Sequence, residues 1–111
     1  MTPARFSPRA ALDLDEHYER IAADNPGAAS RVRDAILDYS DLIARHPGIG
    51  RRIRGASPRH ARIRWLVVPR YRNYLVFFQP IGDTIMVVRV LHAAQDWTQF
   101  FPQAVLAKQR P

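Results

Sequence analysis

The sequence predicts an α+β fold in which an N-terminal helical hairpin packs on an antiparallel sheet of three to four strands, followed by a short C-terminal helix. Two observations predict this class. Apolar residues recur at helical spacing as far as Ile43, and from residue 62 onward they recur at the two-residue period of strands. The order is therefore helix, helix, then three strands, so that one apolar face of the sheet can be covered by the helices.

The length of the chain favours one domain, spanning residues 1–111, because a chain of this size forms a single hydrophobic core. The 47% hydrophobic content is typical of a folded protein. No apolar run approaches the ~18 residues of a membrane span, and the first ten residues lack the apolar stretch of a signal peptide. We therefore expect a cytoplasmic protein with no membrane partner.

The first helix is expected to begin after Ser7, which is placed as its N-cap, with Pro8 at the first helical position. Its apolar stripe is predicted to consist of Ala11, Leu14, Tyr18 and Ile21. The acidic residues of this helix are expected on its polar, solvated side and not in a catalytic pair: Asp13, Asp15, Glu16 and Glu19.

The second helix repeats the same start signal at Asn25-Pro26. It then carries the strongest helical period in the chain, formed by Ala29, Val32, Ile36, Tyr39 and Ile43. Pro47-Gly48 ends it, and residues 48–61 form a loop with three glycines and four arginines.

Three strands follow in a predicted meander. Residues 62–68, "RIRWLVV", alternate in polarity, whereas residues 73–79, "NYLVFFQ", are apolar on both faces and therefore form the central strand. Residues 84–92, "TIMVVRVLH", form the third strand after a turn at Gly82. Residues 3–6 are a candidate edge strand, Asp96 is a candidate cap for the short last helix, and the sheet face opposite the helices is expected to be exposed.

The formal net charge of +7 is divided unevenly along the chain. Residues 1–41 hold eight acidic residues and five arginines, whereas residues 42–111 hold two acidic residues, eleven arginines and one lysine. The planar guanidinium group of arginine can bind a carboxylate or a phosphate through two parallel hydrogen bonds. This pattern therefore predicts an acidic or phosphate-rich partner. The alternative is a basic face that is merely solvated.

Basic residues on the predicted sheet and in the segments beside it are the candidate partner-binding site: Arg59, Arg62, Arg64, Arg72, Arg89 and His92. His92, at the end of the last strand, is either an acid–base group or a packed, hydrogen-bonded histidine. The chain has no cysteine, and its four histidines lack the spacing of metal ligands. We expect neither a metal nor a cofactor.

Four segments, in order and spacing, resemble the ParE branch of the ParE/RelE toxin superfamily over roughly residues 5–97: "FSPRAALDLDEHYERIAADNPGAASRV", "HPGIGRRI", "YRNYLVFF" and "RVLHAAQDW". The resemblance implies a RelE-like fold and the toxin role in a type II toxin–antitoxin pair. It also implies a cognate acidic, ParD-like antitoxin, whose partly disordered segment wraps the toxin.

The superfamily has two known targets. The ParE branch implies inhibition of DNA gyrase by protein–protein interaction, whereas the RelE branch implies cleavage of mRNA on the ribosome. The RelE-type site uses a C-terminal Tyr or His, but residues 93–111 contain neither, and related ParE sequences commonly have Arg where this chain has Gln95.

The leading hypothesis is therefore a non-enzymatic gyrase inhibitor that causes growth arrest. The alternative is a ribosome-dependent endoribonuclease with Arg62, Arg64, Arg89 and His92 as candidate catalytic residues. A third hypothesis is a nucleic-acid-binding module, whose binding would depend steeply on salt.

Overall fold

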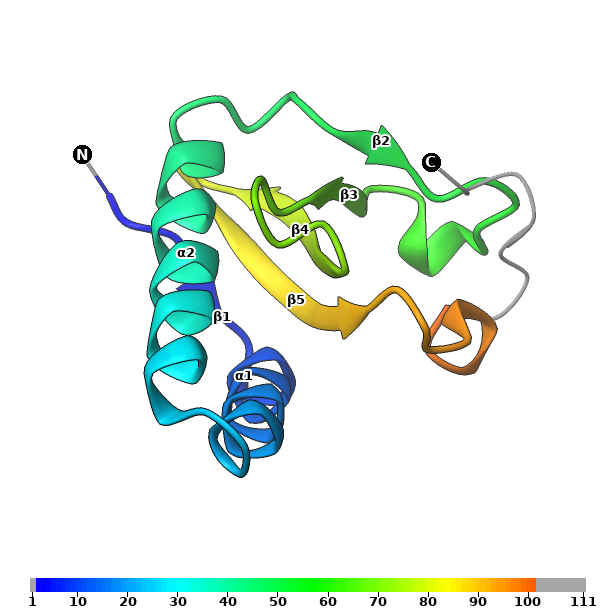
Figure 1. Cartoon of the computed structure of the whole chain (residues 1–111). Coiled ribbons are helices and arrows are strands. Elements are labelled where there is room, and N and C mark those ends of the chain that lie inside the picture. Colours follow the sequence, from blue (N-terminus) through cyan, green and yellow to red (C-terminus); the bar gives the residue numbers. More distant parts are fainter. Residues whose placement is uncertain (1, 102–111) are drawn as a thin grey trace.

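Two helices lie against one face of a five-stranded sheet in the computed structural model, which describes residues 2–101 (Figure 1). The helices are α1 (Pro8–Ala22) and α2 (Pro26–Ala44). The strands are β1 (Arg5–Phe6), β2 (Arg51–Arg52), β3 (Arg64–Val67), β4 (Tyr74–Ile81) and β5 (Thr84–His92). Single turns of 3₁₀ helix lie at η1 (Pro58–His60) and η2 (Trp97–Gln99). The α+β class is confirmed.

The sheet is larger than the predicted meander and is mixed. Its order is β1-β5-β4-β3-β2, and β1 pairs with β5 in parallel, with Arg5 opposite Met86. The candidate edge strand at residues 3–6 is thereby confirmed. Strand β2 was not predicted, because two exposed arginines in a glycine-rich loop show no strand period.

The predicted helix starts are confirmed. Ser7 Oγ accepts a hydrogen bond from the Ala10 N–H at 3.0 Å, and Asn25 Oδ1 accepts one from the Ala28 N–H at 3.0 Å. Each cap satisfies a backbone donor that has no partner within the helix. Asp96 caps the short η2 turn in the same way, through the Thr98 N–H.

The apolar stripe predicted for α1 was wrong in part. Ala10 and Leu14 are buried and Ala11 is exposed, while the buried face also contains Asp13 and His17. Asp13 therefore does not lie on the solvated side. The reason is that this face of α1 borders the edge of β5 as well as the apolar core, and that edge needs polar partners. The stripe of α2 is confirmed, with Ala29, Val32, Ile36 and Ile43 buried.

Strand β4 is central, as predicted, with β5 on one side and β3 on the other. Two consecutive residues of β4, Phe77 and Phe78, are both completely buried, one in each of two hydrophobic clusters. Gly82, at φ 57°, and Asp83 form the two-residue turn between β4 and β5, because Ile81 pairs with Thr84. A turn of this length needs positive φ, which glycine adopts without strain.

The second sheet face is covered, so the expectation of an exposed face was wrong. A cluster on this face joins strand residues such as Trp65 and Phe77 to Trp97 and Phe101, which follow β5. Ile53 and Ile63, which flank η1, complete the cover. The aromatic residues after β5 have no strand or helix period, and for this reason their packing was not foreseen.

Candidate functional site

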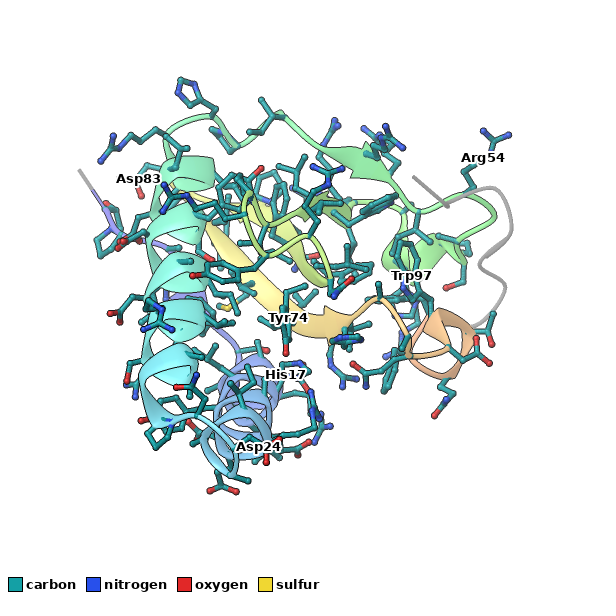
Figure 2. All side chains as sticks on the ribbon, viewed as in Figure 1. His17, Asp24, Arg54, Tyr74, Asp83 and Trp97 are labelled. Atoms are coloured by element: carbon teal, nitrogen blue, oxygen red, sulfur yellow. The ribbon has the colours of Figure 1, made fainter. Side chains whose placement is uncertain are left out.

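Seven exposed arginines surround β2, η1 and the turn between β3 and β4, and we call this set the basic surface: Arg51, Arg52, Arg54, Arg59, Arg62, Arg70 and Arg72. Figure 2 shows Arg54 projecting away from the ribbon. The ion pairs found among residues 2–101 involve only Arg9 and Arg89, so none of the seven is paired with a carboxylate there. Their guanidinium groups keep most of their donors for a partner.

Strand β2 positions two members of the basic surface. Arg52 Nη1 donates to the Ala61 carbonyl oxygen at 3.1 Å, and the Arg51 guanidinium lies 5.5 Å from the centre of the Trp65 ring. Arg51 and Arg72 flank a pocket of about 200 Å³ whose other walls are Trp65, Leu66 and Val67. Two cations above an apolar floor suit a carboxylate next to an apolar side chain.

Backbone strain is present at the same edge. Arg70 has φ 72°, the one residue other than glycine with positive φ in the described part of the chain. Arginine in this region costs about 1–2 kcal/mol relative to a right-handed conformation. The turn therefore holds an exposed arginine where glycine would be more stable.

The remaining predicted residues near β3 differ in solvent exposure and in hydrogen bonding. Arg59 and Arg62 are exposed, whereas Arg64 is half-buried and donates from Nη1 to the Gly50 carbonyl oxygen at 3.1 Å. His60, beside Arg59, packs edge-on against Phe101. Burial, and secondarily the charge of Arg59, lowers the pKa of His60.

Arg89 lies apart from these residues. It pairs across the sheet with Phe77, whereas Arg64 pairs with Phe78, and consecutive residues of a strand face opposite sides. The Arg89 Nε and Nη2 donate to the two carboxylate oxygens of Asp13 at 2.7 and 2.9 Å. Its guanidinium also lies 4.0 Å from the centre of the Phe100 ring. Arg89 is thus held within the molecule.

Asp13 is a buried carboxylate whose position the helical period did not predict. It is 4% exposed, and besides Arg89 it accepts the Val90 N–H at 3.0 Å. Arg9 approaches the same carboxylate to 3.3 Å. The available signal was its spacing, because Ala10, Asp13 and His17 follow one another at three and four residues and share one helical face.

His17 continues this line along α1. Its Nε2 donates to the Val90 carbonyl oxygen at 2.8 Å, and its Nδ1 accepts from Arg20 at 2.6 Å. Burial, which outweighs the hydrogen bond to Val90, lowers the pKa of His17, and the charge of Arg20 acts in the same direction. The ring is therefore a neutral, fixed link between helix and sheet.

Tyr74 connects the two histidines at the end of the sheet. Its ring lies edge-on to His17 and to His92, with 5.1 Å between ring centres in both pairs, and Figure 2 shows Tyr74 and His17 side by side. His92 Nδ1 accepts from the Ala94 N–H at 3.0 Å, and the His92 N–H donates to Gln95 Oε1 at 2.7 Å. Burial and the charge of Arg20 lower the pKa of His92.

The predicted site residues thus fall into two regions. The basic surface includes Arg59, Arg62 and Arg72, and Arg64 lies beside it. Arg89 and His92 instead belong with α1, where His92 borders a second pocket of about 300 Å³, together with Arg20, Ala94 and Gln95.

Nowhere in residues 2–101 do three histidine, aspartate or glutamate side chains gather as a metal-binding group. None of the described helices combines the length and the apolar character needed to cross a lipid bilayer.

Comparison with known proteins agrees with this architecture. Residues 4–97 match the family model described as "ParE toxin of type II toxin-antitoxin system, parDE". The chain is 33% identical over 95 residues to "Putative toxin Y4kP" of Sinorhizobium fredii, a match that covers 86% of this chain and 92% of that protein. A solved structure, "Chromosomal ParDE TA system from P. aeruginosa", superposes with a TM-score of 0.66 at 22% identity, covering 83% of this chain and 96% of the other. The last match shows a shared fold.

Proposed function

Because the chain belongs to the ParE toxin family of type II toxin–antitoxin systems, we propose that it arrests growth by binding DNA gyrase and that a cognate acidic antitoxin of the ParD type neutralises it. The proposal treats the protein as a binding inhibitor and not as an enzyme.

The basic surface is the observation that carries this proposal. Seven exposed arginines without an ion pair among the described residues lie around one short edge strand and two turns. Complementary exposed charges speed the association of two proteins, and two-pronged arginine–carboxylate contacts fix their orientation. An acidic protein segment supplies the carboxylates that the molecule itself does not place there.

The positions of the candidate catalytic residues favour binding over ribonuclease action. Acid–base chemistry needs side chains that converge on one reacting atom. Arg64 and Arg89 belong to opposite faces of the sheet, and Arg89 is engaged by Asp13. His92 uses Nδ1 to hold the turn that follows β5.

A supercoiling assay with purified gyrase and the full chain tests the target. We expect inhibition by the wild type, and weaker inhibition by the double variant Arg51→Ala/Arg72→Ala. Arg31→Ala, an exposed arginine on α2, is the matched control and should inhibit as the wild type does.

Normal supercoiling at a large molar excess of toxin would contradict the gyrase target. A translating extract run in parallel tests the alternative, the ribosome-dependent endoribonuclease. Cleavage of mRNA by the wild type that is lost in His92→Ala would replace the proposed mechanism with an enzymatic one.

The antitoxin is tested by co-expression with the product of an adjoining short reading frame. We expect a stable complex, restored growth and a lower affinity for Arg51→Ala/Arg72→Ala than for Arg31→Ala. An equal affinity of the two variants would exclude the basic surface as the antitoxin site.

A further inference from the structure

The pocket of about 300 Å³ beside the end of β5 is separate from the basic surface and presents only hydrogen-bond donors from its polar side chains. We propose that this pocket is a subsite for a carboxylate, and that it receives one Asp or Glu side chain of the antitoxin. The second half of this proposal rests on the proposed function, whereas the first half does not.

The donor character follows from how the acceptors are already used. His92 Nδ1 accepts the Ala94 N–H, so the proton of the neutral ring is on Nε2. Gln95 Oε1 accepts a hydrogen bond from the backbone N–H of His92. Because a backbone N–H can only donate, the amide NH₂ is the end of Gln95 that stays available for a ligand. Arg20 has five N–H groups and gives one nitrogen to His17 Nδ1.

These groups are held in place before any ligand arrives. The Gln95 and Ala94 contacts fold the turn after β5 back onto His92, and the rings of Tyr74 and His92 pack perpendicular to each other. Arg20 is fixed from the other side by the buried His17 ring. Donors fixed in this way lose little conformational freedom when they bind an anion.

The charge around the pocket suits one negative charge. Among the described residues that line the pocket, Arg20 supplies the single permanent positive charge, and His92 is neutral near pH 7 because its pKa is lowered. No Asp or Glu lines the pocket, and residues 102–111 contain none. One cation with two neutral donors matches a carboxylate, which has two oxygens and about four acceptor positions.

The surroundings favour a protein carboxylate over a nucleic-acid phosphate. Arg20 lies on α1, which also exposes Asp15, Glu16 and Glu19. A polyanion would bring several phosphates toward these acids and be repelled. A peptide can place a single carboxylate in the pocket without a second charge on the adjacent residues, which a chain of phosphates cannot do.

NMR titration of the ¹⁵N-labelled full chain with sodium acetate at constant ionic strength tests the subsite directly. We expect saturable shifts of the Ala94 amide, the Gln95 side-chain NH₂ and the His92 ring, with a Kd on the order of 10 mM. The His92 pKa should rise when acetate is bound, because an adjacent anion favours the charged ring.

Gln95→Glu is the informative variant, because its carboxylate can still accept the His92 N–H while it removes the donors and adds a like charge. It should abolish the acetate shifts, and Arg20→Gln, which keeps a donor for His17, should abolish them too. Gln99→Glu makes the same charge change at an exposed position of η2 and should bind acetate as the wild type does. Unchanged binding in Gln95→Glu, or tighter binding of dimethyl phosphate than of acetate, would overturn the assignment.

The antitoxin occupant is tested by the affinity of the full-chain toxin for the antitoxin. Gln95→Glu should weaken the complex about 10- to 100-fold, while Gln99→Glu should change it less than about twofold. If acetate binds but Gln95→Glu leaves the antitoxin affinity unchanged, the occupant is wrong. If the wild type binds acetate and no antitoxin at all, the proposed function fails while the carboxylate subsite stands.

Discussion

Asp13 shows how one side chain can take the place of a neighbouring strand. Among residues 2–101, no further strand adjoins the edge of β5 beyond β1. Asp13 Oδ2 accepts the Val90 N–H there, and His17 Nε2 donates to the Val90 carbonyl oxygen. Ser7 also bonds the backbone of β5: its N–H donates to the Val87 carbonyl oxygen, and its hydroxyl donates to the Val88 carbonyl oxygen. These bonds satisfy backbone groups that would otherwise be buried without partners.

Asp13→Asn should reduce the free energy of unfolding by about 3 kcal/mol, because it leaves Arg89 largely buried without its counter-charge. Urea denaturation at neutral pH measures the change. Asp15→Asn makes the same substitution at an exposed position of α1 and should stay within about 0.5 kcal/mol of the wild type. Equal effects of the two variants would show that the ion pair between Asp13 and Arg89 does not contribute to the free energy of unfolding.

Stability should fall as the pH drops below about 6.5, the ordinary pKa of histidine. The pKa of His17 is lowered in the folded state, so the unfolded chain binds more protons than the folded one in this range. Of the groups that face His17, Arg20 and His92 lower its pKa, and Asp13 raises it by less than burial lowers it.

Urea unfolding at about pH 7.5 and about pH 5.5 measures this slope in the wild type and in His17→Gln, whose amide can still donate to Val90. The variant should lose less stability on acidification than the wild type does. A smaller slope remains from His60 and His92, whose pKa values are also lowered. Identical slopes in the two proteins would exclude His17 as the titrating group.

At the scale of single residues, contacts between sequence neighbours can be predicted from the sequence, whereas contacts between distant residues cannot. The caps Ser7, Asn25 and Asp96 were predictable because cap and receiving N–H lie two or three residues apart. Asp13 was misplaced because its partners, Arg89 and Val90, lie 76 and 77 residues away. An interpretation based on the spacing of apolar residues places every acidic residue on the solvated side, and it cannot reveal partners so far away in the sequence.

At the scale of elements, β2 depends on the glycine that precedes it. Gly50 has φ 99°, and a Cβ there would lie 3.0 Å from the Phe78 ring and 3.2 Å from the Trp65 carbonyl oxygen. Its own carbonyl oxygen accepts from Arg64. Glycine is therefore required both by the backbone conformation and by the close approach of β3 and β4.

Gly50→Ala should lower the free energy of unfolding by about 2–4 kcal/mol, since strain and overpacking add. Gly48→Ala is the matched control, because nothing lies within 4 Å of its Cβ position. It should leave stability unchanged or raise it slightly. Thermal unfolding followed by circular dichroism compares the two, and a neutral Gly50→Ala would show that the loop relaxes freely.

The long elements were predictable and the short ones were not, for a physical reason. Helices α1 and α2 and strands β4 and β5 each repeat their period often enough to be recognised. Strand β2 has two residues, both exposed, and exists because its backbone pairs with Trp65 and Arg64. For the candidate site, the arginine-rich segment was visible in the sequence, but its separation from Arg89 and His92 was not.

At the scale of the whole molecule, the sheet separates two hydrophobic clusters, and the second depends on residues after β5. Trp97 is 4% exposed and lies edge-on to Trp65 and Phe77, with ring centres 4.8 and 5.0 Å apart. Figure 1 shows this last turn beyond the end of β5, away from the helices.

Trp97→Ala should lower the free energy of unfolding by about 3–5 kcal/mol and uncover part of the second sheet face. Sedimentation velocity should then detect self-association that is absent in the wild type. Thr98→Ala, at an exposed neighbouring position, should leave the protein monodisperse. A monodisperse Trp97→Ala would mean that the face stays covered by other residues.

The division of charge gives the molecule an acidic helical side and a basic sheet edge. If an acidic antitoxin docks at the basic surface, its association rate should fall at least about tenfold between about 50 and 500 mM NaCl. Stopped-flow mixing measures this rate. The variant Arg51→Glu/Arg72→Glu should show a lower rate and a weaker salt dependence, and a rate independent of salt would exclude electrostatic steering.

The way α1 covers the edge of β5 limits how this protein can associate with itself. A fibril of stacked sheets needs two open edges on each molecule, so that every copy can continue the ladder. Asp13 and His17 hydrogen-bond the backbone of Val90, so that part of the β5 edge is closed to a further strand. At the other side of the sheet, Arg51 and Arg52 are exposed on the outer strand β2, where the same arginines of a second copy would repel them. Edge-to-edge pairing through this part of β5, or between two β2 strands, is therefore disfavoured, which limits growth of the sheet into a fibril.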